Sequence, residues 1–242
     1  MKNIIIGVSI FVVVGSIIYM WHQNRKSNHN ERTIKNSDYS KYAVATFAGG
    51  CFWCSEGDFE KTDGVVEVIS GYTGGETKNP SYKEVSGGKT GHREAVQIFY
   101  NPSEVTYEQL LEVFWRHADP TDAGGQFGDR GEQYTTAIYY HDDEQKKAAE
   151  KSKKLLQNSQ KFNKEIVTPI IKFKEFFVAE DYHQNYYKKN SKSYKFYRGR
   201  SGRDDYIKKV WGDTLHGVQK HKTCVIKNSA SACNEKENQK MD

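Results

Sequence analysis

Short apolar runs alternate with polar stretches through the middle of the chain. Five runs have the length and the β-branched or aromatic content of strands, and they cover residues 43–47, 65–72, 94–100, 135–140 and 166–173. Pro169 has no N–H to donate to a neighbouring strand, so the last run is expected at a sheet edge or at a bulge.

The stretches between these runs predict helices. Thr106 and Gln109 have the spacing of a capping box, and the apolar residues that follow share one helical face, namely Tyr107, Leu110, Leu111 and Phe114. Residues 142–161 are charged with sparse apolar positions, as in a surface helix, and a further helix is expected after Asp181. The alternation predicts an α+β domain, a two-layer α/β sandwich with a mixed central sheet and a ferredoxin-like core carrying extra elements.

The first residues form a long apolar run without charge. Ile4 to Trp21 are eighteen consecutive uncharged positions, and at about 1.5 Å per residue they just reach across the ~30 Å hydrocarbon core of a bilayer. A cleaved signal peptide usually has a shorter apolar region and a small-x-small site, which does not follow Met20. We therefore expect a transmembrane anchor or uncleaved signal-anchor at residues 1–23.

The rest of the chain divides by composition. Residues 24–41 are polar and aperiodic, which predicts a linker. A single domain is expected at 42–212, and the polar residues 213–242 are expected to form a poorly ordered tail. With 13% aromatic residues, the core should be built largely from rings. The net charge of +5 arises from lysine-rich stretches without a nucleic-acid-binding motif, so no nucleic acid is expected as a partner.

Four cysteines are present, at positions 51, 54, 224 and 233, which are too few for a disulfide scaffold. Cys51 follows a predicted strand and a Gly49–Gly50 turn, where a helix should begin. The free N–H groups of a helix N-terminus stabilise a thiolate, so Cys51 is a candidate nucleophile whose pKa is expected to be lowered. Cys54 completes a CxxC pair that is compatible with disulfide exchange, with half of a zinc site, or with an attacking and a resolving thiol.

Zinc is disfavoured because Cys224 and Cys233 lack the paired spacing of a zinc ribbon. A general thiol-disulfide oxidoreductase of thioredoxin-like fold is a stronger alternative, since Thr168 and Pro169 imitate the Thr-Pro loop of such proteins. Their motif usually carries Trp before the first cysteine, whereas here Trp53 lies between the pair. This alternative also leaves the other polar clusters unexplained.

These polar and aromatic residues provide the groups that would bind and reduce a sulfoxide. Phe52 and Trp53 offer rings that can wall an apolar pocket for a methyl group. Glu94 opens a predicted strand, and a carboxyl group in an aromatic-lined pocket has a raised pKa and can donate a proton. Tyr82 and Tyr134 offer phenol donors for an oxygen. Methionine sulfoxide requires these parts and a thiolate that attacks its sulfur.

Six ordered blocks between Ala43 and Trp211 carry a resemblance to a known family. They are GCFWC at 50–54, GYTGG at 71–75, PSYKEV at 80–85, GHREAV at 91–96, DRGEQY at 129–134 and AEDYHQNY at 179–186. In order and approximate spacing they resemble the A-type peptide methionine sulfoxide reductases. The agreement covers nearly the whole predicted domain.

The resemblance implies roles for individual residues. Cys51 would attack the sulfur, Phe52 and Trp53 would hold the methyl group, and Glu94 would protonate the oxygen. Attack leaves Cys51 as a sulfenic acid once methionine departs. The family also implies the S epimer of the sulfoxide, since each epimer has its own enzyme.

The resemblance assigns the remaining positions as well. Tyr82 and Tyr134 would hydrogen-bond the sulfoxide oxygen, and Asp129 would help to position the substrate. Cys54 would resolve the sulfenic acid, as in the branch of the family that carries a CFWC motif. The disulfide would then be reduced by a thioredoxin-type protein or another dithiol, with no metal or other cofactor. His183 is expected to have a structural role near the site.

Many members recycle instead through C-terminal cysteines on a glycine-rich tail. Cys224 and Cys233 lack that setting, so we place Cys54 ahead of them, with the tail cysteines as relays at most. The expected partners are oxidised proteins and peptides, a thioredoxin-like reductant and a membrane. Basic residues flank the apolar segment on both sides and do not decide its orientation. A tether suits an enzyme that repairs envelope proteins, so we expect an extracytoplasmic catalytic domain.

Overall fold

The computed structural model describes residues 39–212. The predicted anchor at 1–23, most of the predicted linker and the predicted tail at 213–242 lie outside the described residues. Within 39–212, no helix is long and apolar enough to cross a membrane.

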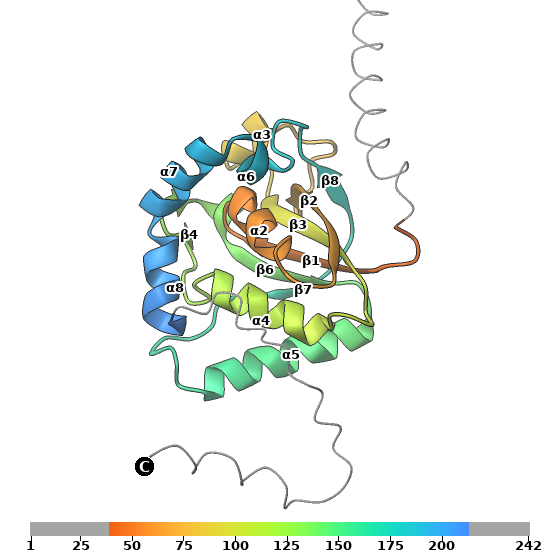
Figure 1. Cartoon of the computed structure of the whole chain (residues 1–242), viewed down its shortest axis with the longest axis vertical. Helices are drawn as coiled ribbons and strands as arrows, with labels where there is room; N and C mark the ends of the chain where they lie inside the picture. Colours follow the sequence, from red (N-terminus) through yellow and green to blue (C-terminus); the bar gives the residue numbers. More distant parts are fainter. Residues whose placement is uncertain (1–38, 213–242) are drawn as a thin grey trace, which may run out of the picture.

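A six-stranded sheet forms the centre of the domain (Figure 1), with its strands in the order β7-β6-β1-β3-β2-β8. The strands are β1 (Ala43–Gly49), β2 (Val65–Thr73), β3 (Arg93–Tyr100), β6 (Thr136–Tyr140), β7 (Ile170–Lys172) and β8 (Phe176–Val178). A separate two-stranded sheet pairs β4 (Gly125–Gln126) with β5 (Asp129–Arg130). The first four apolar runs of the sequence are therefore strands, within two residues of the predicted bounds.

Seven helices and a 3₁₀ turn are described in the range 39–212. The helices are α2 (Phe52–Phe59), α3 (Tyr82–Ser86), α4 (Tyr107–His117), α5 (Asp143–Asn158), α6 (Tyr186–Lys189), α7 (Ser191–Ser201) and α8 (Arg203–Trp211), and the 3₁₀ turn is η1 (Glu132–Tyr134). Figure 1 shows α4 and α5 side by side, with α7 and α8 along one flank of the domain.

The core has the predicted ferredoxin-like topology. The order β1-α2-β2-β3-α4-β6 along the chain gives the spatial order β6-β1-β3-β2, and all of these neighbours pair antiparallel. The edge strand β7 pairs parallel with β6, which makes the sheet mixed. β8 adds a short antiparallel strand beside β2 at the opposite edge.

The predicted capping box at the start of α4 is confirmed. Gln109 N donates to Thr106 Oγ1 at 3.2 Å, and Thr106 N donates to Gln109 Oε1 at 2.8 Å. The predicted surface helix begins one residue later than expected, because Asp142 serves as its N-cap and accepts from Gln145 N at 2.8 Å.

Two predicted elements are wrong in extent or type. The run 166–173 contributes only the three-residue edge strand β7, because Thr168 is buried in a hydrogen bond to Thr136 and Pro169 cannot donate. The edge position itself is as expected. The helix expected after Asp181 begins only at Tyr186, because residues 181–185 form a turn in which Asn185 has φ 56°.

Stacked rings fill the main core, as the composition suggests. Phe47 on β1 stacks on Phe59 and Phe114, with ring centroids 5.4 and 5.1 Å apart. These contacts fix α2 and α4 against β1, and they thereby fix the start of α2.

Candidate active site

Cys51 lies at the N-cap of α2, directly after the turn that follows β1. Gly50 has φ +86°, and a Cβ there would lie 2.7 Å from Gln126 Cβ and 2.8 Å from Arg203 Nη2. Only glycine meets both the backbone and the packing requirement at this turn. The sequence prediction of a strand, a glycine turn and a helix start at Cys51 is therefore confirmed.

Glu94 is placed beside this helix start by β3. Its Oε2 accepts a hydrogen bond of 3.0 Å from the backbone N–H of Phe52, and the residue is only 2% exposed. Burial raises the pKa of the Glu94 carboxyl to about 8, although the Phe52 N–H opposes this shift. Glu94 is consequently protonated at neutral pH and can donate a proton inside the site.

The two thiols of the CxxC pair are both buried and free. Burial raises the pKa of the Cys51 thiol, and the nearby Cys54 and Glu94 raise it further. The expectation of a lowered Cys51 pKa is therefore wrong for the free protein, because loss of solvent outweighs the helix N-terminus. Interaction with the Cys51 thiol lowers the pKa of the Cys54 thiol instead.

Tyr82 begins α3, Tyr134 ends η1, and both phenols are half-buried. Burial raises the pKa of Tyr82 to about 12, and the nearby Glu94 and Cys51 raise the pKa of both phenols. The structure thus brings the two tyrosines together with the carboxyl group and the thiol, as the sequence predicts.

Aromatic rings surround these polar groups. The Phe52 ring is 1% exposed and stacks on Tyr82 with centroids 6.4 Å apart. Trp53 is half-buried and stacks on Tyr186 at 3.7 Å with only 8° between the ring planes. The ring centroids of Phe52 and Trp53 lie 6.5 Å apart with 36° between the ring planes, so the two rings form adjoining apolar surfaces at the start of α2.

His183 holds one of these rings in place. Its Nδ1 accepts a hydrogen bond of 3.1 Å from Trp53 Nε1, and its ring packs on Phe52 at 4.9 Å and on Tyr82 at 4.4 Å. Burial lowers the pKa of His183 to about 4, so the ring is neutral near pH 7. These contacts support a structural role, directed at the side chain of Trp53.

Asp129, on β5, is half-buried and accepts a hydrogen bond from the phenol of Tyr197, on α7. Tyr197 also packs against the buried cluster formed by Cys51, Cys54 and Tyr194. Sequence reasoning missed Tyr197, because it lies in a lysine-rich segment without a motif. It also missed a buried group of charged residues behind the thiols, formed by Asp58, His117, Arg198 and Arg203.

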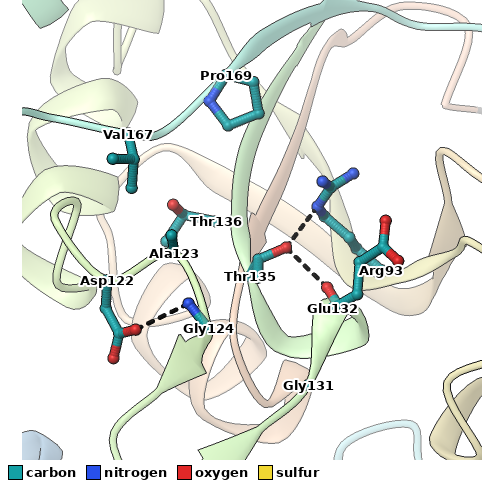
Figure 2. A pocket seen from close by; sticks show the side chains of 10 residues that line it. All are labelled: Arg93, Asp122, Ala123, Gly124, Gly131, Glu132, Thr135, Thr136, Val167 and Pro169. Carbon is teal, nitrogen blue, oxygen red and sulfur yellow. Dashed lines mark hydrogen bonds between the residues drawn. The ribbon is translucent and has the colours of Figure 1, made fainter.

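A pocket that contains neither thiol is lined by residues that flank Tyr134 in the sequence, among them Glu132 and Thr135 (Figure 2). Among its lining residues, Arg93 Nε donates to Thr135 Oγ1 at 2.8 Å, and Thr135 Oγ1 donates to the Glu132 carbonyl at 2.7 Å. These bonds fix the backbone on both sides of Tyr134. We place the chemistry at Cys51, because only that cluster combines a thiol, an acid and phenols.

The described residues contain no group of three or more His, Cys, Asp or Glu side chains arranged for a metal ion. Cys224 and Cys233 lie outside the described range. A buried thiol beside a neutral carboxylic acid and two phenols is the set of groups that a thiol-dependent reductase requires. The rings around it suit a substrate with a small apolar group next to an oxygen.

Comparison with known proteins agrees with this class. Residues 43–215 match the family described as "Peptide methionine sulfoxide reductase". The chain is 56% identical over 173 residues to the peptide methionine sulfoxide reductase MsrA of Bacillus velezensis, covering 72% of this chain and 98% of that protein. It is 48% identical over 206 residues to the peptide methionine sulfoxide reductase MsrA/MsrB of Vibrio cholerae. That alignment covers 85% of this chain and 53% of the relative, so this chain spans about half the length of that protein.

Solved structures give the same answer. Reduced Mxr1 of Saccharomyces cerevisiae aligns with a TM-score of 0.59 at 36% identity, covering 63% of this chain and 87% of that one. Methionine sulfoxide reductase A of Corynebacterium diphtheriae aligns with a TM-score of 0.56 at 32% identity, covering 62% and 76%. The chain belongs to the peptide methionine sulfoxide reductase family, and it is an oxidoreductase that reduces methionine sulfoxide. The general thiol-disulfide alternative is thereby set aside.

Proposed function

We propose that this chain reduces the S epimer of methionine sulfoxide in peptides and proteins, with Cys51 as nucleophile and Glu94 as general acid. The observation that carries the proposal is the buried Glu94 carboxyl, whose pKa of about 8 keeps it protonated next to the start of the helix that bears Cys51. A general disulfide exchanger has no use for such an acid.

The geometry supports a binding mode for the sulfoxide. Its methyl group lies between the rings of Phe52 and Trp53, and its oxygen accepts hydrogen bonds from Tyr82 and Tyr134. Asp129, whose side chain is half-buried, helps to position the rest of the substrate. Phenols and a neutral acid stabilise the negative charge that develops on the oxygen as the sulfur is attacked.

The first half of the reaction is a two-electron transfer. Cys51 Sγ bonds to the sulfoxide sulfur while Glu94 protonates the oxygen. The hydroxyl group then passes to Cys51, and methionine leaves with the electron pair of the broken bond. The proton lost by the Cys51 thiol restores the acid form of Glu94. Methionine sulfur is thus reduced, and Cys51 is oxidised to a sulfenic acid.

The second half requires Cys54. Its thiolate attacks the sulfenic sulfur of Cys51, a disulfide forms, and the hydroxyl leaves with a proton as water. The two thiols lie buried in one cluster, which supports this assignment, and we propose that the chain belongs to the branch with a CFWC motif. A thioredoxin-type protein or another dithiol then reduces the disulfide, so the chemistry requires no metal or prosthetic group.

Mutation of the two cysteines tests the order of events. Cys51→Ser should abolish methionine formation from a peptide containing the S-sulfoxide. Cys54→Ser should release one equivalent of methionine and then stall, with a sulfenic acid on Cys51 that dimedone traps. Normal cycling of Cys54→Ser with thioredoxin would refute the resolving role. Glu94→Gln should lose sulfoxide reduction, whereas a general exchanger would still reduce insulin.

We also propose that residues 1–23 anchor the enzyme in a membrane with the catalytic domain on the extracytoplasmic side. The uncharged run from Ile4 to Trp21 supports the anchor. The test is to label intact cells with a membrane-impermeant thiol reagent and to locate the label by peptide mass spectrometry. Labelling of the cysteine peptides only after lysis would place the domain in the cytoplasm.

A further inference from the structure

Arg203, on α8, has the largest of the fully buried side chains in the described range and is 1% exposed. Its Nη1 donates to His117 Nε2 at 2.8 Å and to the His117 carbonyl at 2.6 Å, and its Nη2 donates to the Gly49 carbonyl at 3.1 Å. Two of the three acceptors are backbone carbonyls and the third is a ring nitrogen. None of them is a carboxylate.

The nearest buried carboxylate already has a cation. Asp58 Oδ1 accepts from Arg198 Nη1 at 2.7 Å, and Asp58 Oδ2 lies 2.6 Å from His117 Nδ1. Although burial opposes it, the Arg198 guanidinium and the His117 hydrogen bond hold the pKa of Asp58 well below its usual range.

His117 does not balance the charge of Arg203, because a histidine ring is either neutral or positively charged. Burial lowers the pKa of His117 to about 4, and the charge of Arg203 acts in the same direction. The neutral ring therefore donates through Nδ1 to Asp58 and accepts through Nε2 from Arg203. Asp58 is thus matched by Arg198, and no buried carboxylate within residues 39–212 bonds to Arg203. Asp204, the second partner of Arg198, has a side chain that is 54% exposed to solvent.

An unmatched cation in the interior is costly unless an anion lies nearby. Cys54 is the candidate, because it is 0% exposed and lies one turn before Asp58 in α2. Its chain neighbour Ser55 and Arg203 both bond to His117 Nε2, at 3.0 and 2.8 Å, so the guanidinium lies beside this turn of α2. Several charged and titratable side chains change the pKa of Cys54 or have their own pKa changed by it. They are Cys51 at the N-cap of α2, Asp58 on α2, Glu94 on β3, Tyr194, Tyr197 and Arg198 on α7, and Arg203 on α8.

Among these groups, interaction with Cys51 lowers the pKa of Cys54 most. Arg203 and then Arg198 lower it further, against the effects of burial and Asp58. Arg198 is already neutralised by Asp58. The charge of Arg203 is the one that a thiolate can balance.

We propose that Arg203 is a positioning residue for the second half of the reaction, and that its buried guanidinium is the counter-charge of the Cys54 thiolate. The proposal rests on the proposed resolving role of Cys54. Only the thiolate attacks a sulfenic sulfur, so Arg203 determines how fast the Cys51–Cys54 bond forms. Its bond to the Gly49 carbonyl also holds the turn before Cys51, which is a purely structural contribution that the test must separate.

The direct test is a pH titration of Cys54. In Cys51→Ser, which keeps an O–H donor beside Cys54, the rate of iodoacetamide labelling is followed on the Cys54 peptide by mass spectrometry. Adding Arg203→Gln should slow labelling at pH 7 by about tenfold or more and move the profile to higher pH. Arg203→Lys, which retains the charge, should stay within about threefold of the parent.

Arg200→Gln is the matched control, because it removes a positive charge from the exposed face of α7 and should leave the profile unchanged. The Cys51→Ser protein also tests the proposal when Arg203→Gln does not fold. A Cys54 that titrates at or above the ordinary thiol value with Arg203 intact would overturn it.

Rapid-quench kinetics with otherwise unmodified protein separate the two halves of the reaction. At pH 7, Arg203→Gln should slow disulfide formation about tenfold more than it slows release of the first methionine. An equal slowing of both steps would reduce Arg203 to a structural residue. Continued turnover of Cys54→Ser would instead refute the role of Cys54 itself, so the two failures are distinguishable.

Discussion

The phenol of Tyr197 on α7 donates a hydrogen bond to Asp129 on β5, and the Tyr197 side chain packs against the cluster that contains Cys51 and Cys54. One side chain from the C-terminal part of the domain therefore connects the nucleophile with the residue proposed to position the substrate. A phenol has a single proton to donate. Occupation of Asp129 by a substrate group would leave that proton free for the sulfur of Cys51.

Tyr197→Phe should consequently impair the first half of the reaction. The nearby Tyr197 phenol lowers the pKa of Cys51 against the effect of burial, so loss of its hydroxyl should shift the pH profile of the methionine burst to higher pH. A loss of about 1 kcal/mol, or roughly fivefold in rate at pH 7, is expected. Tyr206→Phe is the matched control, because the buried hydroxyl of Tyr206 has no hydrogen-bond partner. An unchanged burst in Tyr197→Phe would contradict the assignment.

The acid Glu94 should limit activity on the alkaline side. Because burial raises its pKa to about 8, the rate of the methionine burst should fall as the pH rises through about 8 and the acid form is lost. Glu94→Gln should lower the burst rate about 10²–10⁴-fold and abolish this alkaline limb. Burst rates between pH 6 and pH 10 provide the measurement. A wild-type burst that rises steadily to pH 10 would show that no acid is required.

The same group should make stability depend on pH. The pKa of Glu94 is raised from 4.5 to about 8 in the folded protein, so the folded state binds the proton more tightly than the unfolded state does. Its contribution to stability is complete below about pH 4.5 and is lost as the pH rises through about 8. Melting temperatures should show Glu94→Gln gaining on the wild type from pH 6 to pH 9. Glu165→Gln, at an exposed position, should not gain.

The turn before Cys51 should tolerate no side chain. Gly50→Ala combines a φ of +86° with contacts of 2.7 and 2.8 Å to Gln126 and Arg203. Strain alone is expected to cost roughly 1–3 kcal/mol of unfolding free energy, with an additional loss of activity because Cys51 follows directly. Gly199→Ala is the control, since a Cβ there meets nothing within 4 Å and the change should be neutral or slightly stabilising. Urea denaturation of both variants measures the difference.

Local patterns predict the sheet and the start of the site because their causes are local. Alternation and β-branched residues define β1, β2, β3 and β6, and the hydrogen bonds between Thr106 and Gln109 connect neighbours three residues apart. Gly50 and Cys51 are likewise fixed by the turn they occupy. Glu94 is a buried acid through its place on β3, which the sequence also predicts.

The remainder of the site depends on contacts between distant residues. Arg203 meets the Gly49 carbonyl across 154 residues, and Arg198 meets Asp58 across 140. Residues 191–211 are polar and weakly periodic, so no local signal reveals that their tyrosines and arginines face the thiols. The lowered Cys51 pKa was predicted wrongly for a related reason, because the depth of burial is a property of the folded domain.

The late position of α7 and α8 in the chain has a consequence during synthesis. All four strands of the ferredoxin-like core precede residue 141, so the sheet can form while the final helices are still within the ribosome. Until Tyr197 and Arg203 emerge, the nascent chain carries two cysteines without the side chains that enclose them. The two thiols are therefore most accessible to oxidants before α7 and α8 have packed against the start of α2.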